Sequence, residues 1–347
     1  MNLKTTFFAL ILIVFSFFSC NQKVKELKKI DSSMFKNHLP SWNNGATKTA
    51  IIDFVEKTTK KGGPDFVKEE DRIACFDNDG TLWAEQPFYS QLSFALDQVK
   101  IMAPQHPEWK TTQPFKAVLE GDMKTVMEGG DKYILAIVGA THSGMDTDVF
   151  NQSVKDWMAT AKHPRFDQPY SKMIYTPMVE LLQYLRDNGY KTFIVSGGGV
   201  DFMRPWVEEA YGIPSYQVVG SSGKLKYDTI ATPKLNKLPE LNFIDDKDGK
   251  PVGIHQFIGK KPIFTVGNSD GDYEMMQWTN SSTGPHFSMF IHHTDAVREW
   301  AYDRDSKIGH LSVGLDNAKK YGFVIMDMKN DWLQVFPFQT PDKKSKK

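Results

Sequence analysis

The chain has few cysteines and no excess of either charge. Only two of its 347 residues are cysteines, and 42 basic side chains balance 42 acidic ones. A protein that neutralises a nucleic-acid backbone needs a basic excess, so the composition argues against nucleic acid as a partner. Cys75 lies inside an apolar run, where a free cysteine behaves as a small hydrophobic residue. We therefore expect no disulfide between Cys75 and Cys20.

Long apolar runs are also missing, apart from one near the N-terminus. Residues 7–18 form an apolar or small stretch of twelve residues after Lys4. This stretch is shorter than the roughly 20 residues that span a bilayer and is typical of the core of a signal peptide. The Ser19-Cys20 pair that follows resembles a relaxed bacterial lipobox, which implies cleavage before Cys20 and acylation of that residue.

We interpret residues 1–20 as a lipoprotein signal peptide and residues 21–40, which are polar and basic, as a tether. The expected location is the bacterial cell envelope, with the protein lipid-anchored, facing the periplasm, and touching the membrane only through its N-terminal lipid. An ordinary secretory signal, with Cys20 incidental, and an uncleaved anchor are the alternatives. No later segment is apolar enough to cross a membrane.

Most of the remaining chain alternates between strand and helix patterns. Continuous apolar runs, which are typical of buried parallel strands, occur at residues 73–76, 192–195, 262–266, 287–292 and 323–326. Helical patterns lie between them, and we expect one more helix after residue 292, through Trp300. Short strands at 216–220 and 224–227 are predicted to flank a turn at Gly223. This alternation predicts an α/β fold with a doubly wound parallel sheet.

Residues 86–175 have a different composition. They are rich in Met, Gln, Lys and aromatic residues, and helical patterns recur at 89–102, 114–128 and 149–161. We interpret this segment as a helical insert that divides the core into residues 41–85 and 176–347.

Three predicted strands end in polar or glycine-rich clusters. These are Asp-Asn-Asp-Gly-Thr at 77–81, Ser-Gly-Gly-Gly at 196–199 and Asn-Ser-Asp-Gly-Asp at 268–272. Ligands of doubly wound sheets bind beyond the carboxyl ends of the strands. The three clusters are therefore predicted to form one site.

The first cluster carries two carboxylates, Asp77 and Asp79, on a turn that Gly80 allows to be tight. One carboxylate can act as a nucleophile and the other as a general acid and base. Their mutual repulsion requires a cation, and Mg²⁺ suits a site built from oxygen ligands. A solvated Asx-rich turn is the alternative.

The second cluster and a lysine could bind phosphate. The hydroxyl of Ser196 and the N–H of Gly197 could hold a phosphoryl oxygen, although a flexible glycine turn has the same sequence. Lys250, which opens a short helix, could neutralise both phosphate and nucleophile. Lys260 and Lys261 compete for this role, but they directly precede a strand and are expected at the opposite edge of the sheet.

The sequences FDNDGT at 76–81, VSGGG at 195–199, the lysine at 250 and VGNSDGD at 266–272 occur in the order of four motifs. In this order and approximate spacing the chain resembles the haloacid dehalogenase superfamily, in its phosphoserine-phosphatase-like branch. The resemblance extends from about residue 40 to the end. It implies a Rossmann-like core with a helical cap inserted between the first and second motifs.

The resemblance implies a role for each matched residue. Asp77 attacks phosphorus and ligates Mg²⁺, and Asp79 is the acid and base and offers its backbone carbonyl to the metal. Asp272 holds Mg²⁺ directly or through water. The implied phosphate-binding set is Ser196, Gly197, Lys250 and Thr81, the last of which also supports the loop.

One position departs from the branch. Asn268 stands where this branch usually has aspartate, so either Asn268 or Asp270 is expected to supplement Asp272 at the metal. Just past the first motif, Trp83 and Glu85 could contact the leaving group or pack at the cap hinge. Three histidines, His142, His292 and His293, are weaker candidates.

The expected activity is Mg²⁺-dependent hydrolysis of a small phosphomonoester through an aspartyl-phosphate on Asp77. The acid/base at Asp79 separates this expectation from the dehalogenases of the superfamily, which lack it. A phosphotransferase or phosphomutase using the same intermediate remains an alternative. The second alternative is a non-catalytic envelope protein that binds a phosphorylated ligand.

Overall fold

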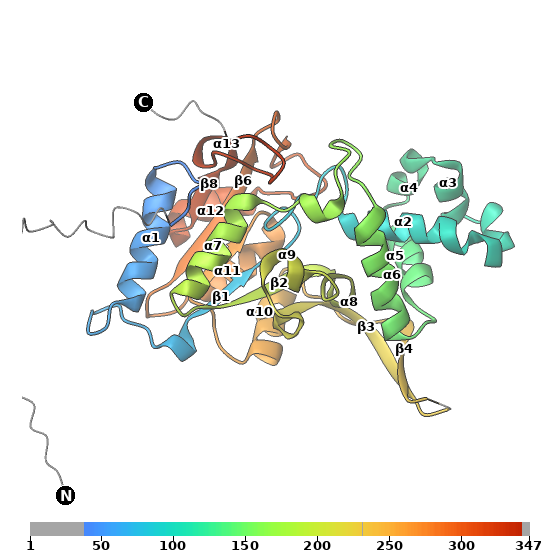
Figure 1. Ribbon diagram of the computed structural model, residues 1–347, viewed down its shortest axis with the longest axis horizontal. Coiled ribbons are helices and arrows are strands. Elements are labelled where there is room, and N and C mark those ends of the chain that lie inside the picture. Colours follow the sequence, from blue (N-terminus) through green and yellow to red (C-terminus); the bar gives the residue numbers. More distant parts are fainter. Residues whose placement is uncertain (1–37, 231, 342–347) are drawn as a thin grey trace, which may run out of the picture. The chain divides into compact units, whose positions relative to one another are not determined.

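The computed structural model describes residues 38–230 and 232–341 (Figure 1). The predicted signal peptide, Cys20 and nearly all of the predicted tether lie outside these residues. No helix within the described ranges is long and apolar enough to cross a membrane.

The core is one eight-stranded sheet in which most neighbouring strands are parallel. Its order is β4-β3-β2-β1-β5-β6-β7, and β8 pairs with β6. The strands are β1 (Ile73–Phe76), β2 (Lys191–Gly199), β3 (Val218–Asp228), β4 (Lys234–Phe243), β5 (Phe264–Gly267), β6 (Phe287–Thr294), β7 (Ala301–Tyr302) and β8 (Val324–Asp327). The predicted α/β fold with a mostly parallel sheet is therefore confirmed.

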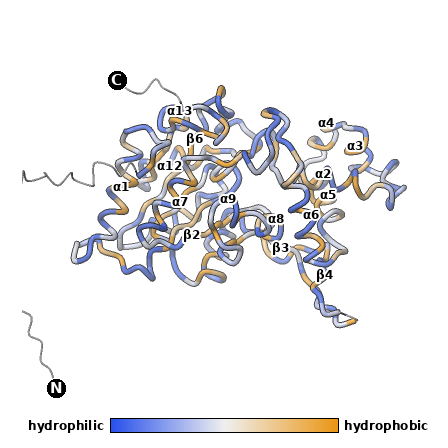
Figure 2. The backbone as a smooth tube through the Cα atoms, viewed as in Figure 1, coloured by the Kyte–Doolittle hydropathy of each residue, from blue (hydrophilic) through white to orange (hydrophobic). Residues whose placement is uncertain are grey.

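Helices cover both faces of the sheet because side chains alternate along its strands. Ala74 and Phe76 of β1 pack with the apolar faces of α1 (Ala46–Thr59) and α7 (Thr176–Asp187). Their neighbours Ile73 and Cys75 face the other layer, formed by α10 (Gly249–Gly253), η7 (Ile254–Ile258) and α11 (Tyr273–Asn280). Figure 2 shows hydrophobic and hydrophilic residues alternating along α7, as expected of a helix with one buried face.

The helical segment lies between β1 and β2. It consists of α2 (Ser90–Met102), α3 (Phe115–Glu120), α4 (Met123–Glu128), α5 (Gly130–His142) and α6 (Thr147–Thr160), with short 3₁₀ turns between some of them. The predicted helix at 114–128 is two helices, because Gly121 ends α3 in the left-handed conformation (φ 73°). Helix α5 was not anticipated.

Two other sequence expectations were wrong. Gly223 is not a turn, since β3 continues through it and forms an antiparallel hairpin with β4, which the sequence did not reveal. The segment after β6 is not a helix through Trp300 but a turn leading into β7. In both places the antiparallel partner strand determines the backbone, and local propensity does not encode that partner.

Candidate active site

The loop after β1 holds the two predicted catalytic carboxylates. The backbone N–H of Asp77 donates to the carbonyl of Val266 in β5 (3.0 Å), so Asp77 is fixed as a continuation of the sheet. The carbonyl of Asn78 then accepts N–H groups from the next turn. Gly80 makes this turn with φ 70°, and a Cβ there would clash with the side chains of Asn268 and Glu85.

Lys250 holds the carboxylate of Asp77 in place. Its ammonium donates to Asp77 Oδ1 (2.8 Å), to the carbonyl of Val195 (3.0 Å) and to Asp272 Oδ1 (2.5 Å). An ammonium has three hydrogens, so all of its donors are satisfied by the protein. Lys250 therefore fixes the position of Asp77 as well as supplying positive charge.

Ser196 and its glycines form a bulge at the end of β2. Ser196 pairs with Gly220 of β3, yet the next pair is Gly199 with Ser221, so Gly197 and Gly198 leave the ladder. The N–H of Gly198 donates to Ser196 Oγ (3.1 Å). A Cβ on Gly198 would lie 3.4 Å from both Ser196 Oγ and Asp79 Oδ2, so these oxygens lie beside the same glycine. The bulge thus brings the second motif to the first.

Thr81 and Trp83 lie behind the cavity rather than in its wall. Thr81 is fully buried and donates to Asn268 Oδ1 (3.1 Å), so it supports the loop and is not placed to bind phosphate. Trp83 is also fully buried, and it stacks on Trp206 with ring centroids 4.3 Å apart. Its Nε1 donates to Asp79 Oδ1 (2.9 Å). Trp83 therefore orients Asp79 and does not reach a leaving group.

The polar side chains of the third cluster, residues 268–272, have different partners. Asp270 accepts the N–H groups that begin α12 (Val313–Tyr321), including those of Ser312 and Gly314, so it caps that helix and is not available to supplement a metal. Asn268 donates to Glu85 Oε1 (2.6 Å) while its oxygen accepts from Thr81. The amide of Asn268 is thus engaged away from Asp77.

Asp272 binds Lys250 as Asp77 does. Its Oδ2 accepts the N–H groups of Asn268 (3.0 Å) and Ser269 (3.1 Å), and its Oδ1 takes the lysine. The two carboxylates that the sequence proposed for a metal therefore converge on one nitrogen.

Burial raises the pKa of several carboxyl groups here. Desolvation raises the pKa of Asp77, against the lowering effect of Lys250, and raises the pKa of Asp79 to about 6. The same cause raises the pKa of Asp245 to about 7 and that of Glu85 well above its usual range. Asp245, which no sequence motif indicated, is fully buried close to Ser196 and Lys250.

Oxygen ligands for a cation are present, although they are few. Within residues 38–230 and 232–341 no group of three or more His, Cys, Asp or Glu side chains is arranged to hold a metal ion. Asp77 and Asp272 are the carboxylates that could contribute, and the backbone carbonyl of Asp79 follows on the same loop. Such a donor set suits Mg²⁺, which keeps several waters and needs only one or two protein carboxylates.

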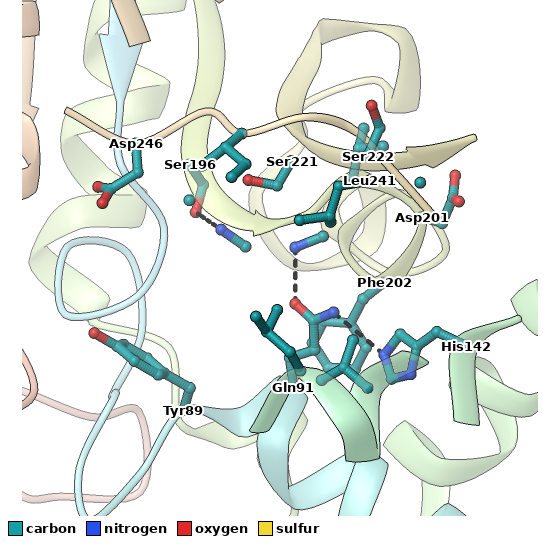
Figure 3. A pocket seen from close by; sticks show the side chains of 18 of the residues that line it. Tyr89, Gln91, His142, Ser196, Asp201, Phe202, Ser221, Ser222, Leu241 and Asp246 are labelled. Atoms are coloured by element: carbon teal, nitrogen blue, oxygen red, sulfur yellow. Dashed lines mark hydrogen bonds between the residues drawn. The ribbon is translucent and has the colours of Figure 1, made fainter. Parts of the chain in front are cut away.

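A cavity of about 730 Å³ opens above these residues. Asp77, Asp79 and Ser196 line it together with helix α5 and strand β4. Figure 3 shows the part of its wall that includes Ser196, Gln91 and Leu241. Glu85 also lines it, while Tyr302 donates to Glu85 Oε1 (2.8 Å) from behind. Of the predicted hinge residues, only Glu85 therefore reaches the space where a leaving group would lie.

A hydrogen-bonded chain that the sequence did not predict joins the cap to the second motif. The N–H of Gly199 donates to Gln91 Oε1 (2.7 Å), and Gln91 Nε2 contacts His142 Nε2 (3.2 Å), as Figure 3 shows. Thr141 donates its hydroxyl hydrogen to the carbonyl of Ile137 (2.8 Å), so it accepts from His142 Nδ1 (2.9 Å). His142 Nε2 is thereby left to accept from Gln91. The contacts define a neutral imidazole protonated on Nδ1.

The other two candidate histidines face away from the cavity. His293 is buried and donates to the carbonyl of Gly80 (2.8 Å), so it supports the first-motif turn from below. His292 contacts Asp303 (3.1 Å). Lys260 contacts Asp71 (2.6 Å) and Lys261 contacts Ser281 (2.7 Å), so neither takes the place of Lys250 beside Asp77.

Replacing His142 with glutamine is expected to flatten the pH dependence of stability. Burial and the nearby charge of Lys237 lower the pKa of His142 to about 3. An unfolded histidine takes up a proton below about pH 6.5, so acidification favours the unfolded state until the pH falls through the folded pKa. Between pH 7 and pH 5 the parent should lose about 1 to 2 kcal/mol more unfolding free energy than the variant.

Urea denaturation at the two pH values measures this difference. Glutamine at the exposed residue His286 is the matched control and should keep the parent's pH dependence. If the unfolding free energy of the His142 variant changed between the two pH values as much as that of the parent, the assignment of His142 as a neutral, buried imidazole would be contradicted.

Comparison with known proteins agrees with the arrangement of the motifs. Residues 74–277 match the model of the haloacid dehalogenase-like hydrolases. A search of curated protein sequences returned no match.

Solved structures align with this chain at low sequence identity, and the first of the three that follow shows a similar fold. A conserved protein of unknown function from Anaerococcus prevotii DSM 20548 aligns with a TM-score of 0.52 at 16% identity, covering 75% of this chain and 89% of its own. A protein of unknown function from Bordetella pertussis Tohama I gives 0.46 at 14% identity, with 74% and 98% coverage. A phosphoserine phosphohydrolase-like protein from Francisella tularensis subsp. tularensis SCHU S4 gives 0.36 at 16% identity, with 63% and 87% coverage.

The family match spans more than half of the chain. It includes every strand-end cluster gathered around the cavity, from Asp77 through Ser196 to Asp272. On this match the chain belongs to the haloacid dehalogenase-like hydrolase family.

Proposed function

We propose that the chain is a magnesium-dependent phosphatase that hydrolyses a small phosphomonoester. The observation that carries the proposal is the meeting of two carboxylates, Asp77 and Asp79, with Ser196 and its glycine bulge at the floor of a cavity. The hydroxyl of Ser196 and the N–H of the exposed Gly197 are donors for phosphoryl oxygens, whereas the N–H groups of Gly198 and Gly199 are bonded within the protein. A solvated Asx-rich turn would not need a buried lysine bound to its first carboxylate. Here the buried Lys250 binds Asp77.

In the first step a carboxylate oxygen of Asp77 attacks phosphorus and displaces the ester oxygen. Lys250 holds Oδ1 of Asp77, so the other carboxylate oxygen is free to attack. Asp79 gives its proton to the departing alcohol from Oδ2, while Trp83 holds Oδ1. The raised pKa of Asp79, about 6, lets a fraction of this group carry a proton near neutral pH.

In the second step water attacks the aspartyl-phosphate and Asp79 accepts a proton from that water. Inorganic phosphate and the free carboxylate of Asp77 result, and the enzyme returns to its starting state. Bound Mg²⁺, held by Asp77, Asp272 and the carbonyl of Asp79, would neutralise charge on the phosphoryl group. Transfer to another alcohol instead of water would give the phosphotransferase alternative.

Removing the metal is expected to abolish hydrolysis reversibly. The purified full-length chain should release phosphate from p-nitrophenyl phosphate with millimolar Mg²⁺ and lose this activity in excess EDTA. Restored Mg²⁺ should recover it, whereas Ca²⁺ should recover far less, because Ca²⁺ takes six to eight ligands at longer distances. Full activity in EDTA would overturn the metal requirement, and the absence of turnover on a panel of phosphomonoesters would overturn the phosphatase proposal.

A further inference from the structure

The outer half of the cavity lies between the cap and the β3–β4 hairpin. Helix α5 contributes Ile134, Leu135 and Val138, and strand β4 contributes Leu238, Pro239 and Leu241. The hairpin is fixed to the cap by two backbone hydrogen bonds. The N–H of Lys237 donates to the carbonyl of Met145 (2.9 Å), and the N–H of Gly144 donates to the carbonyl of Lys237 (2.9 Å).

Much of this outer half is apolar, including the rim of its mouth. Leu135, Leu241 and Ile244 line the cavity and are 54%, 51% and 57% exposed. Large apolar side chains that stay accessible at the rim of a cavity are typical of a ligand-binding surface. A phosphoryl group at Ser196 would occupy only a small part of about 730 Å³, so the rest can enclose an aromatic ring or an alkyl chain.

Both lysines of the cavity wall are already paired with carboxylates. Lys237 and Lys250 are its basic side chains, and no arginine lines it. Lys250 is bound by Asp77 and Asp272. Lys237 pairs with Asp201 and lies over the ring of Phe150, with its nitrogen 4.5 Å from the ring centroid.

The remaining charge of the outer wall, Glu240, is negative, and Asp246 adds a second negative charge to the cavity beside Gly197 and Gly271. Within the described residues neither carboxylate forms a salt bridge. A carboxylate or second phosphate on the leaving group would lie among these acids without a free cation. Drawing Lys237 away to pair with that anion would leave Asp201, whose side chain is 24% exposed, without its counter-charge.

We infer that the cavity between α5 and β4 binds the leaving group of the phosphomonoester, and that this group is an uncharged, partly apolar alcohol. The inference rests on the proposed phosphatase function and narrows its substrate class. Alkyl and aryl monophosphates belong to this substrate class. Phosphoserine, sugar bisphosphates and phosphorylated carboxylic acids fall outside, since each would place a second anion in the apolar half.

A matched pair of substrates tests the inference. The full-length chain should hydrolyse 4-methylphenyl phosphate with kcat/KM about tenfold or more above 4-carboxyphenyl phosphate. The carboxylate makes the phenol a better leaving group, so a lower value for this substrate reports binding and not intrinsic reactivity. Equal values, or a preference for the carboxylate, would overturn the inference and leave the phosphatase proposal standing.

Calorimetric titration with benzylphosphonate and 4-carboxybenzylphosphonate decides the question without turnover. Benzylphosphonate should bind about tenfold tighter or more in the parent. Arginine at Leu241 should raise affinity for the carboxylate ligand about tenfold. Arginine at Leu225 is the control, because Leu225 is 46% exposed on the same hairpin but lies outside the cavity wall. This variant should not raise the affinity for the carboxylate ligand.

The outcomes separate the two proposals. An inactive protein that still prefers benzylphosphonate would overturn the phosphatase function and keep the binding site. Equal gains from both arginine variants would show a general charge effect and overturn the assignment of Leu241 to the leaving-group site. Equal affinity of the parent for the two phosphonates would overturn the inference directly.

Discussion

Replacing Asp77 with asparagine is expected to lower the kcat of p-nitrophenyl phosphate hydrolysis by about three orders of magnitude or more. The amide cannot form the aspartyl-phosphate, and the rate advantage of a positioned covalent nucleophile is lost with it. The variant should remain folded. Burial already disfavours the charged form of Asp77, and Lys250 keeps its bonds to Asp272 and the carbonyl of Val195.

The measurement is a steady-state assay with Mg²⁺, together with a thermal unfolding curve for each protein. Asparagine at Asp53, exposed on α1, is the matched control and should retain parental turnover. A folded Asp77 variant with more than about a tenth of parental activity would remove Asp77 from the nucleophile's role. Another group or a water molecule would then have to attack phosphorus.

Replacing Lys250 with methionine is expected to cost about 3 to 5 kcal/mol of unfolding free energy. Burial alone would lower the pKa of this lysine, but Asp272 and Asp77 raise it above its ordinary value. Asp77 is 7% exposed and Asp272 fully buried, so both would lose their counter-charge in a desolvated place. Total stabilities are about 5–15 kcal/mol, so the loss should be plain in urea denaturation.

Two further variants distinguish the loss of this counter-charge from a general effect of removing a lysine. Methionine at Lys260 breaks an exposed pair with Asp71 and should cost about 1 kcal/mol or less. Adding Asp272→Asn to the Lys250 variant removes one of the two stranded charges and should recover part of the loss. Unchanged stability of the single variant would show that the carboxylates are protonated or solvated without the lysine.

Local sequence predicted the parts of the site that lie on single strands. The run from Ile73 to Phe76 is buried on both faces of the sheet, and such runs carry a continuous apolar signal. Parallel strands end at one edge, so the clusters after β1, β2 and β5 could be expected to meet. They do so around Asp77, Ser196 and Lys250.

Contacts between distant segments explain where the sequence predictions failed. Asp270 lies in the expected motif, yet its carboxylate caps a helix that begins more than forty residues later, at Val313. Thr81 looked available for phosphate, but Asn268 accepts its hydroxyl hydrogen. The sequence around Gly223 indicated a turn, but in the structure Gly223 lies within β3 and pairs with β4. No local pattern encodes these partners.

The sequence by itself determined the parallel core, the order of the motifs and the identity of the two catalytic candidates. Each of these follows from short-range patterns, namely apolar runs, glycines and paired carboxylates. The tertiary structure alone decided which charges are already matched and what forms the wall opposite Asp77. Salt bridges and apolar walls form between residues far apart in the chain, so only folding determines that Lys237 pairs with Asp201 and that α5 faces β4.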